Sequence, residues 1–371
     1  MYFVGGFLGS GKTTAIAGAC RRLIAAGKRV GVVTNDQGKL QVDSLFMSSS
    51  GIPSVEVGGG CFCCRYDDFD AKLAALAARE LPDAIFAESV GSCADIVATV
   101  VRPFETFRED YGKGSVFSVF ADSRLLLARL DGRRLPFSED VLYLFGRQLE
   151  EADILVLNKR DLLAEGERAR LPGLAAAAWP GKALLEISGS TDEGVSAWLA
   201  ALEAARERIP RPPLDIDYER YGSGERELSW LDEALVIEDS GGLASDGGRC
   251  RRAIVDFVLG LVDGLGPASR SIGHLKLHVA AAGYEGKLGL TAGDFLGPAE
   301  PRSLVEAQLP PFTVRRALVA INARAQLSPE LLSSAVGAAV EGARRSAGVS
   351  IAEEDRSAFR PGRPEPTHRM G

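Results

Sequence analysis

One glycine-rich segment, Gly6–Thr13 with the sequence GFLGSGKT, most constrains what this chain can fold into. Its glycines let the backbone turn tightly around a phosphate group, and the lysine and threonine at its end supply a cation and a hydroxyl. The apolar run before it predicts a strand. The Ala- and Ile-rich run after it predicts a helix whose positive N-terminal end faces the anion. A strand, a phosphate-binding loop and a helix in this order predict an α/β nucleotide-binding domain.

The chemistry of this loop gives each of its polar residues an expected role. Lys12 is expected to reach the β- and γ-phosphates and to act in catalysis, and Thr13 to ligate Mg²⁺ through its hydroxyl. The residues expected to contact the nucleotide here are Gly9, Ser10, Gly11, Lys12, Thr13 and Thr14. The competing interpretation is a glycine-rich turn with a chance lysine, but the strand and helix that flank the segment favour nucleotide binding.

Short apolar strands alternate with helical segments over residues 1–208, which predicts a P-loop domain with a mainly parallel sheet. The expected strands are 2–6, 29–34, 84–87, 115–121, 153–157 and 184–187, and the expected helices include 13–26, 70–79 and 138–151. Clustered prolines from Ile209 to Pro213 predict a linker over 209–227. Residues 228–350 do not keep this regular alternation of strands and helices, and their pattern predicts a smaller α+β domain. Residues 351–371 predict a disordered tail.

Another buried strand ends in Asn158-Lys159-Arg160-Asp161. A carboxylate at Asp161 accepts hydrogen bonds from guanine N1–H and N2–H₂, and adenine offers no such pair of donors. Asn158 is expected to bridge the base edge and the phosphate loop, and Lys159 to cover the ring face. Ser188, after a further strand, is expected to bring a backbone contact to the base. The alternatives are that Asn158–Asp161 is a solvated loop and that Ser188 lies in an ordinary turn.

Three cysteines, Cys61, Cys63 and Cys64, lie within four residues and directly follow three glycines. As thiolates they suit Zn²⁺, Cu⁺ or another soft or borderline ion. We predict a metal site with three protein ligands, which leaves one position open for transfer. A redox thiol cluster and a set of buried structural cysteines are the alternatives. Cys20 and Cys250 are expected to be packing or surface residues, and no site is assigned to Cys93.

The overall composition is that of a soluble globular protein. The 371 residues carry a formal net charge of −7, with 46% hydrophobic and 25% charged residues. This acidic balance argues against nucleic acid as a partner, and no apolar run is long enough to span a bilayer, so no membrane partner is expected. The N-terminal residues lack a basic segment followed by an apolar one. We therefore expect a cytoplasmic protein whose six cysteines stay reduced.

Five segments together resemble the CobW family, a branch of the metallochaperone P-loop GTPases that also includes UreG and HypB. The matching segments are Gly5–Thr14, Thr34–Gly38, Gly60–Cys64, Glu88–Gly91 and Asn158–Asp161, in the family's order and at compatible spacings. The resemblance covers residues 1 to about 205. It implies a GTPase domain whose Cys-x-Cys-Cys loop handles a metal ion.

The resemblance also implies roles that the residues alone do not reveal. Glu88 takes the place of the acid near Mg²⁺, and Asn35–Asp43 becomes the first switch, with Asp36 or Asp43 near the metal or the attacking water. The expected catalytic residues are Lys12, Asp36 and Glu88, and the expected Mg²⁺ ligands are Thr13, Asp43 and Glu88. The alternative is a strand-end carboxylate at Glu88 and solvated loop acids at the two aspartates.

The second domain departs from the family, whose members often carry a histidine-rich stretch, since this chain has three histidines. His274 and His278 share one face of an expected strand at a separation of about 13 Å, which is too far for one ion. We therefore expect both to be surface residues.

Together these observations predict a GTP-hydrolysing metallochaperone or metal-insertion factor that binds GTP, Mg²⁺ and a transition metal, Zn²⁺ or Co²⁺. Its partner is expected to be a client metalloprotein or cofactor-assembly protein. Only Gln37 is available as a weak candidate to position water, so we expect slow turnover that a partner or homodimerisation raises. The rivals are a regulatory GTPase with a structural metal and a P-loop kinase or ATPase with redox thiols.

Overall fold

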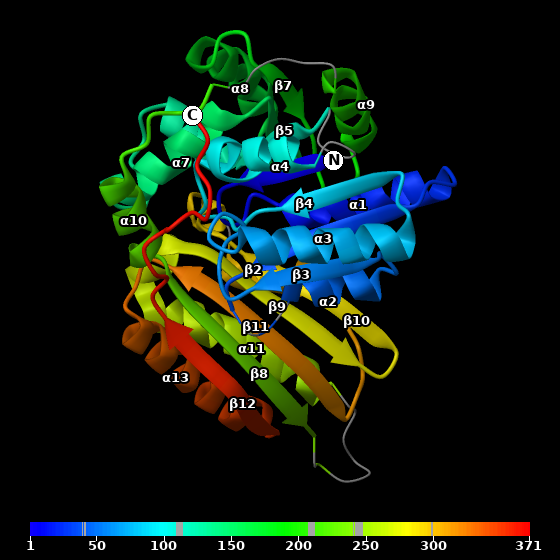
Figure 1. Cartoon of the computed structure of the whole chain (residues 1–371). Helices are drawn as coiled ribbons and strands as arrows, with labels where there is room; N and C mark the ends of the chain where they lie inside the picture. The colour runs from blue at the N-terminus through cyan, green and yellow to red at the C-terminus, as the bar shows by residue number, and fades with distance from the viewer. Residues whose placement is uncertain are drawn as a thin grey trace. The chain divides into compact units, whose positions relative to one another are not determined.

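The computed structural model describes residues 1–38, 40, 42–108, 114–206, 212–239, 241, 248–297 and 300–371. The chain forms two compact units, each built from segments that are far apart in the sequence (Figure 1). The first unit contains residues 1–37, 47–225 and 362–371, and the second contains residues 38–46 and 226–361. Among the described residues, no helix is both long and apolar enough to cross a membrane.

The first unit is built on a seven-stranded sheet with the order β3-β2-β4-β1-β5-β6-β7. Its strands are β1 (Tyr2–Gly6), β2 (Val30–Asp36), β3 (Ser54–Gly58), β4 (Ala84–Glu88), β5 (Val116–Asp122), β6 (Ile154–Asn158) and β7 (Ala183–Glu186). Every neighbouring pair is parallel, which confirms the predicted α/β fold with a parallel sheet. All seven carboxyl ends therefore lie at one edge of the sheet.

Helices cover both faces of this sheet. They are α1 (Lys12–Ala25), α3 (Tyr66–Glu80), α4 (Arg102–Phe107), α6 (Ser123–Leu130), α7 (Glu139–Glu151), α8 (Glu165–Ala178), α9 (Val195–Ala205) and α10 (Tyr218–Glu227), while α2 (Val42–Ser49) begins in the second unit. Phe3 on β1 packs against Phe69 of α3 and Phe104 of α4. On the opposite face, the Trp198 ring of α9 lies 5.8 Å from that of Phe86 on β4. Large aromatic side chains thus fix the layers on either side of the sheet.

The second unit is an antiparallel sheet with helices over one face. The strands run in the order β10-β9-β11-β8-β12, with β8 (Ser229–Glu238), β9 (Ile272–Ala281), β10 (Tyr284–Leu290), β11 (Arg316–Ala325) and β12 (Ser350–Phe359). The helices are α11 (Arg249–Leu265), α12 (Pro301–Gln308) and α13 (Pro329–Ala347). Apolar residues of these helices and strands form one continuous core. Ser328 caps α13 by accepting a hydrogen bond from Leu331 N at 3.2 Å, as its position before a proline predicts.

Two histidines of β9 are buried, so the prediction that they are surface residues is wrong. His274 and His278 are each 5% exposed. His274 Nε2 lies 2.5 Å from Asn322 Oδ1, and His278 Nε2 lies 3.0 Å from Glu285 Oε1. Burial lowers the pKa of His274 well below its usual value, so this ring is neutral at physiological pH. Alternation along the strand placed both histidines on one face but did not show that this face is buried.

The chain after residue 350 also differs from the expected disordered tail. β12 pairs with β8 and carries a run of four charged residues, Glu353–Arg356, which is typical of an edge strand and hides the strand pattern. Residues 362–371 return to the first unit, where Met370 N donates to Ala98 O at 2.8 Å. Within the predicted linker, Tyr218–Glu227 is helix α10, and residues 207–211 lie outside the described part of the chain.

A buried ion-pair cluster joins the 38–46 segment to the sheet of the second unit. Asp43 accepts hydrogen bonds from Lys276 Nζ at 2.5 Å and from Lys287 Nζ at 2.8 Å. Burial alone would raise the pKa of Asp43, but the two ammonium groups hold it well below its usual range. The charged cluster is therefore a stabilising element of this unit at neutral pH.

We predict that Asp43→Asn lowers the free energy of unfolding by about 3 kcal/mol, because it leaves two half-buried lysines without their counterion. Since the folded-state pKa is depressed, this stabilisation is present at neutral pH and is lost as pH falls below about 4. Denaturant unfolding at pH 7 and at pH 3 measures both effects. Glu306→Gln, which removes an exposed pair with Arg302, is the control and should change little. Equal losses in the two variants at pH 7 would contradict the assignment.

Candidate nucleotide and metal sites

The phosphate loop follows β1, and its geometry explains its glycines. Lys12 Nζ donates to Gly6 O at 2.9 Å, and Thr13 Oγ1 donates to Glu88 Oε1 at 2.9 Å. Gly11 has a φ of +85°, and a Cβ atom there would lie 2.4 Å from Asn158 Nδ2. A side chain at this position is therefore excluded both by backbone conformation and by contact. The structure brings the expected cation, hydroxyl and acid together at the start of α1.

The donor set at this point fits a bound magnesium ion. Thr13 supplies a hydroxyl oxygen and Glu88 a carboxylate, and oxygen atoms are the ligands that Mg²⁺ prefers. Both side chains are buried and already in contact through the hydrogen bond between them. A bound Mg²⁺ would supply positive charge beside the phosphates, with these two residues as its protein ligands.

The residues of the predicted base site are linked to the phosphate loop by hydrogen bonds. Asn158 Nδ2 donates to Ser10 O at 2.7 Å, while Asn158 Oδ1 accepts from Gly189 N at 3.0 Å. One amide therefore ties the phosphate loop to the turn at Ser188–Gly189. Asp161 Oδ2 accepts from Ser190 Oγ at 3.4 Å. Among the described residues, Asp161 Oδ1 is buried without a hydrogen-bond partner, which is the state expected of an acceptor that awaits a base.

Asp122, which sequence reasoning missed, positions the lysine of the base site. It ends β5, and its Oδ2 lies 3.0 Å from Lys159 Nζ and 2.7 Å from Arg124 Nη2. Burial would raise the pKa of Asp122, but the two neighbouring cations lower it below its usual range. Lys159 itself has a left-handed φ of 62°. The sequence offered one signal for Asp122, which is that it directly follows the predicted buried strand 115–121.

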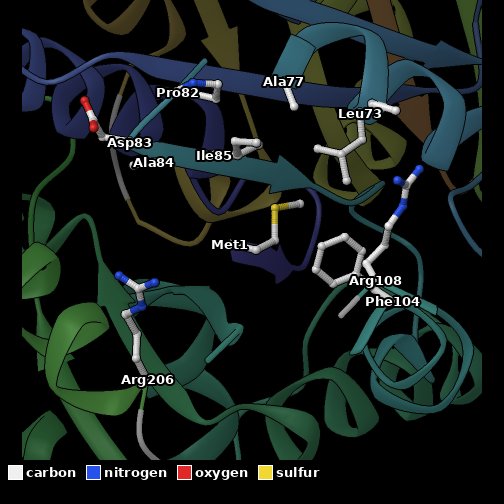
Figure 2. Close-up of a pocket in the computed structure, with 11 residues that line it drawn as sticks. Met1, Leu73, Ala77, Pro82, Asp83, Ala84, Ile85, Phe104, Arg108 and Arg206 are labelled. Atoms are coloured by element: carbon white, nitrogen blue, oxygen red, sulfur yellow. The ribbon is translucent and has the colours of Figure 1, made fainter. Parts of the chain in front are cut away.

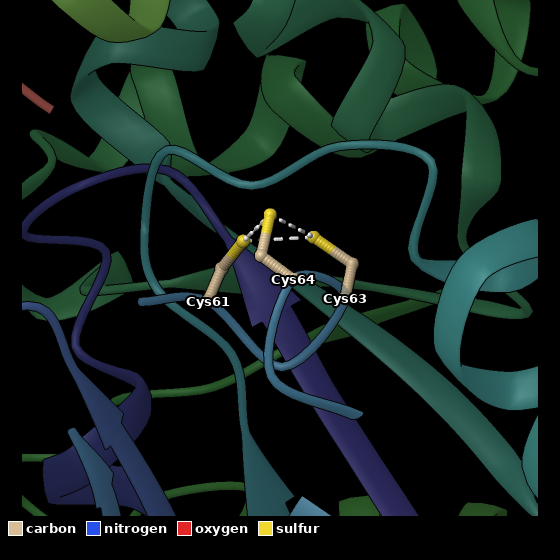
Figure 3. Close-up of side chains that lie close together, drawn as sticks. All are labelled: Cys61, Cys63 and Cys64. Atoms are coloured by element: carbon tan, nitrogen blue, oxygen red, sulfur yellow. Dashed lines mark hydrogen bonds between the residues drawn. The ribbon is translucent and has the colours of Figure 1, made fainter. Parts of the chain in front are cut away.

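The three cysteines after β3 converge on one point (Figure 3). Cys61 Sγ lies 2.8 Å from Cys63 Sγ and 3.2 Å from Cys64 Sγ, and the third separation is 3.8 Å. A tight turn, with Arg65 N donating to Cys61 O at 3.0 Å, places the side chains on the same side. Hydrogen bonding to Cys61 is the main reason that the pKa of Cys64 rises to about 11, so the metal-free thiol is protonated at neutral pH. Three sulfur atoms at such separations fit a soft or borderline metal ion.

Asn35, near the end of β2, holds this thiol loop in place. Its Nδ2 donates to Val57 O at 2.8 Å and to Gly60 O at 2.7 Å. Its Oδ1 accepts from Phe62 N at 2.8 Å. A single buried amide therefore makes one hydrogen bond to β3 and two to the loop that carries the cysteines. The residue immediately after it is Asp36, at the carboxyl edge of the sheet.

Residues 362–371, which belong to the first unit, reach the thiol loop. Glu365 N donates to Cys64 Sγ at 3.3 Å, and Thr367 N donates to Cys63 O at 2.8 Å. The ring of His368 then packs 5.0 Å from that of Tyr66. The contacts of residues 365–368 were not predicted, because these residues lie far from the cysteine motif in the sequence.

Not every predicted residue joins these sites. Asp36 is buried at the end of β2, and Gln37 Nε2 donates to Glu225 Oε1 at 3.1 Å. Asp43 has both carboxylate oxygens bound to lysines of the second unit, so we do not include it among the proposed Mg²⁺ ligands. Within the predicted switch, residues 39 and 41 lie outside the described part of the chain.

A separate pocket of about 130 Å³ lies at the amino ends of β1 and β4, away from the phosphate loop (Figure 2). Met1, Leu73 and Ile85 are among its apolar lining residues. Arg108 on its wall is already paired with Asp70 at 2.6 Å. This pocket gathers no group of metal ligands, and we assign it no function.

Comparison with known proteins matches residues 1–182 to the nucleotide-binding domain described as CobW/HypB/UreG. The zinc chaperone CobW of Sinorhizobium sp is 32% identical over 44% of this chain and 52% of its own length. The zinc chaperone YeiR of Escherichia coli K12 is 31% identical over 42% of this chain and 45% of its own. This chain thus spans about half the length of the curated relatives that it matches.

Among solved structures, the hydrogenase maturation factor HypB of Archaeoglobus fulgidus is similar over 55% of this chain and 89% of its own, at 18% identity and a TM-score of 0.38. The family match covers the phosphate loop, the cysteine motif, Glu88 and Asn158–Asp161. Residues 1–182 of this chain thus carry the nucleotide-binding domain of the CobW/HypB/UreG family.

Proposed function

We propose that this chain is a GTP-hydrolysing metallochaperone or metal-insertion factor. Its cargo is a transition metal ion, which Cys61, Cys63 and Cys64 hold and pass to a client metalloprotein or cofactor-assembly protein. Zn²⁺ is the first candidate because two relatives are named zinc chaperones, and Co²⁺ suits the same thiolates. The observation that carries the proposal is the bridge that Asn35 makes between β2 and the thiol loop.

The nucleotide part of the proposal rests on the hydrogen bonds that link the base-site residues to the phosphate loop. Lys12 and the amide groups at the start of α1 would hold the phosphates. Asp161 would select guanine through its unpartnered oxygen. Thr13 and Glu88 would hold Mg²⁺, while Asp36 stands as the candidate to position the attacking water. Lys12 would offset the negative charge that builds up on the phosphates during hydrolysis.

The metal part of the proposal follows from a shared edge of the sheet. The thiol loop follows β3, and the phosphate loop follows β1, so both leave the sheet at its carboxyl edge. A nucleotide that reorders the segment after Asp36 would act on Asn35 and hence on the geometry of the sulfur atoms. Such coupling is reciprocal, so metal binding must change GTP affinity by the same factor.

A regulatory GTPase with a structural metal remains the second candidate. The burial of Cys61 and Cys63 favours it, because structural zinc ions are enclosed by their ligands. The two functions differ in metal exchange. A chaperone releases its ion to a chelator and stays folded, whereas a structural site loses its fold when the ion is removed.

For guanine selection, we predict that Asp161→Asn weakens GTP binding by about 100-fold or more, because two charge-assisted hydrogen bonds to the base are lost. Binding of xanthosine triphosphate should improve, since its base presents an acceptor where guanine presents a donor. Fluorescent-nucleotide titration measures both. Asp131→Asn, which removes a surface pair with Arg170, is the control. A wild-type chain that binds ATP as tightly as GTP would show that Asp161 does not select the base.

For hydrolysis, we predict that Lys12→Ala lowers the GTP turnover rate by at least about 100-fold, because the cation beside the phosphates is removed. Phosphate release under single-turnover conditions measures the rate. Lys28→Ala, at an exposed position after α1, should leave it unchanged. Turnover at the wild-type rate in the Lys12 variant would place the reaction elsewhere in the chain.

For coupling, we predict that the wild-type chain binds one Zn²⁺ more tightly with GTP and Mg²⁺ than with GDP, by a factor of about 5 to 150. Asn35→Ala should abolish this difference, because its hydrogen bonds to β3 and to the thiol loop are lost. Competition against a chromophoric chelator measures the affinity in each nucleotide state. Thr34→Ser, one residue earlier on β2, is the control.

Replacing Cys61, Cys63 and Cys64 together by serine should remove the ion and leave a folded chain that still binds GTP. Equal zinc affinity of the wild-type chain with GTP, with GDP and without nucleotide would contradict the proposed coupling. Loss of folding in the triple-serine variant would favour the structural-metal function.

A further inference from the structure

We propose that residues 363–370, the covering segment, lie over the exposed side of the metal centre and move away before the ion passes to a client. This inference rests on the proposed function, because it names the part of this chain that retains the ion held by the three motif cysteines. It follows from hydrogen bonds, ring contacts and an ion pair within the first unit, to which the covering segment belongs.

The three motif cysteines are not equally buried. Cys61 is 5% exposed and Cys63 is 1% exposed, whereas Cys64 is only partly buried. The backbone N–H of Glu365 donates to Cys64 Sγ at 3.3 Å, and that of Thr367 donates to Cys63 O at 2.8 Å. The covering segment therefore contacts the cluster at its most exposed sulfur, which is the side from which a chelator or a client reaches the ion.

The sequence of the covering segment favours an extended chain with few free amides. Pro364 and Pro366 have no N–H group, and each restricts the residue before it to extended conformations. Glu365 therefore carries the one N–H of residues 364–366, and this group donates to sulfur. The next available N–H, that of Thr367, also donates to the thiol loop. The two prolines thus preorganise the segment, which lowers the entropic cost of its contact with the loop.

Side chains along the covering segment alternate between two environments. One set is exposed and consists of Arg363, Glu365, Thr367 and Arg369. The other set is buried or half-buried and consists of Pro364, Pro366, His368 and Met370. This period of two is that of an extended chain that lies on a surface. Residues 363–370 form no helix or strand, so they can detach while the sheet of the first unit stays folded.

Contacts beyond the thiol loop hold the covering segment in place. The His368 ring lies 5.0 Å from that of Tyr66 at the start of α3 and 5.1 Å from that of Phe107 at the end of α4. Met370 N donates to Ala98 O at 2.8 Å. The segment is therefore attached to two helices as well as to the loop that carries the cysteines.

An ion pair attaches the covering segment to the interior of the first unit. Arg369 Nε donates to Asp95 Oδ2 at 2.7 Å, and Tyr218 Oη donates to the same oxygen at 2.6 Å. The Arg369 side chain is 41% exposed, whereas the Asp95 side chain is fully buried. Because a buried carboxylate is costly without a cation beside it, Asp95 favours the state in which the covering segment is in place.

Alkylation of the metal-free chain by iodoacetamide, without oxygen, tests whether the segment covers Cys64. Glu365→Pro replaces the N–H that donates to sulfur by a ring carbon and keeps the backbone extended. Cys64 should then react about 3 to 10 times faster, as expected for the loss of one hydrogen bond. Glu365→Ala, which removes the same exposed side chain but keeps the N–H, should react at the wild-type rate. Mass spectrometry of the peptide that contains Cys64 measures the rate.

Zinc transfer from the loaded full chain to a chromophoric chelator tests whether the segment retains the ion. Release should be about 10 to 100 times faster in Glu365→Pro, because the hydrogen-bond partner of a metal ligand is lost. Arg369→Ala, which removes the pair with Asp95, should also speed release. Its control is Arg249→Ala in the second unit, which likewise separates a half-exposed arginine from a fully buried aspartate, Asp239. This control should leave release unchanged.

Faster alkylation and faster release in Glu365→Pro and Arg369→Ala, with both control variants at wild-type rates, support the proposal. Unchanged rates in Glu365→Pro and Arg369→Ala overturn it and leave the proposed metal-handling function intact. Equal acceleration in Arg369→Ala and Arg249→Ala also overturns it, because the effect then reflects a general loss of stability. A wild-type chain that takes up no zinc contradicts the proposed function and, with it, the retention of an ion by this segment.

Discussion

The parallel pairing of the first sheet is the constraint on which the rest of the structure depends. Parallel strands place all their carboxyl ends at one edge, and in this chain those ends carry polar residues or loops: Gly6, Asp36, Gly58, Glu88, Asp122 and Asn158. Four of these residues, Asp36, Glu88, Asp122 and Asn158, are buried polar residues. The phosphate loop, the acid, the base-reading segment and the thiol loop are therefore neighbours because of strand order, although about 150 positions separate the first from the base-reading segment in the sequence.

At that edge, the side chains of two asparagines connect neighbouring segments through hydrogen bonds. Asn158 joins the phosphate loop to the Ser188–Gly189 turn, and Asn35 joins β2 to the thiol loop. Each amide both donates and accepts, so each fixes the spacing of two loops at once. If one of the two connected segments moves, the other must move with it, or the hydrogen bonds of the asparagine break. This is how the fold would convert a change at the nucleotide into a change at the sulfur atoms.

Local patterns predicted what local chemistry determines, and they failed where distant segments meet. Three motifs indicate their chemistry within a few consecutive residues: the glycine loop, the Asn158–Asp161 segment and the Cys61–Cys64 motif. Asp122 matters only because β5 lies beside β6, which no periodicity reveals. The pairing of Asp43 with two lysines, and the return of residues 362–371 to the thiol loop, are tertiary contacts made by polar segments that resemble solvated loops.

Amide hydrogen exchange at the thiol loop tests the central claim most directly, because it reports on a hydrogen bond of Asn35 itself and needs no added metal. The reporting group is the Phe62 N–H, which donates to Asn35 Oδ1 at 2.8 Å. If nucleotide state acts through Asn35, peptides that contain residues 57–65 will exchange more slowly with GTP and Mg²⁺ than with GDP. Identical exchange of these peptides in both states, with the phosphate-loop peptides protected by nucleotide, would contradict the account.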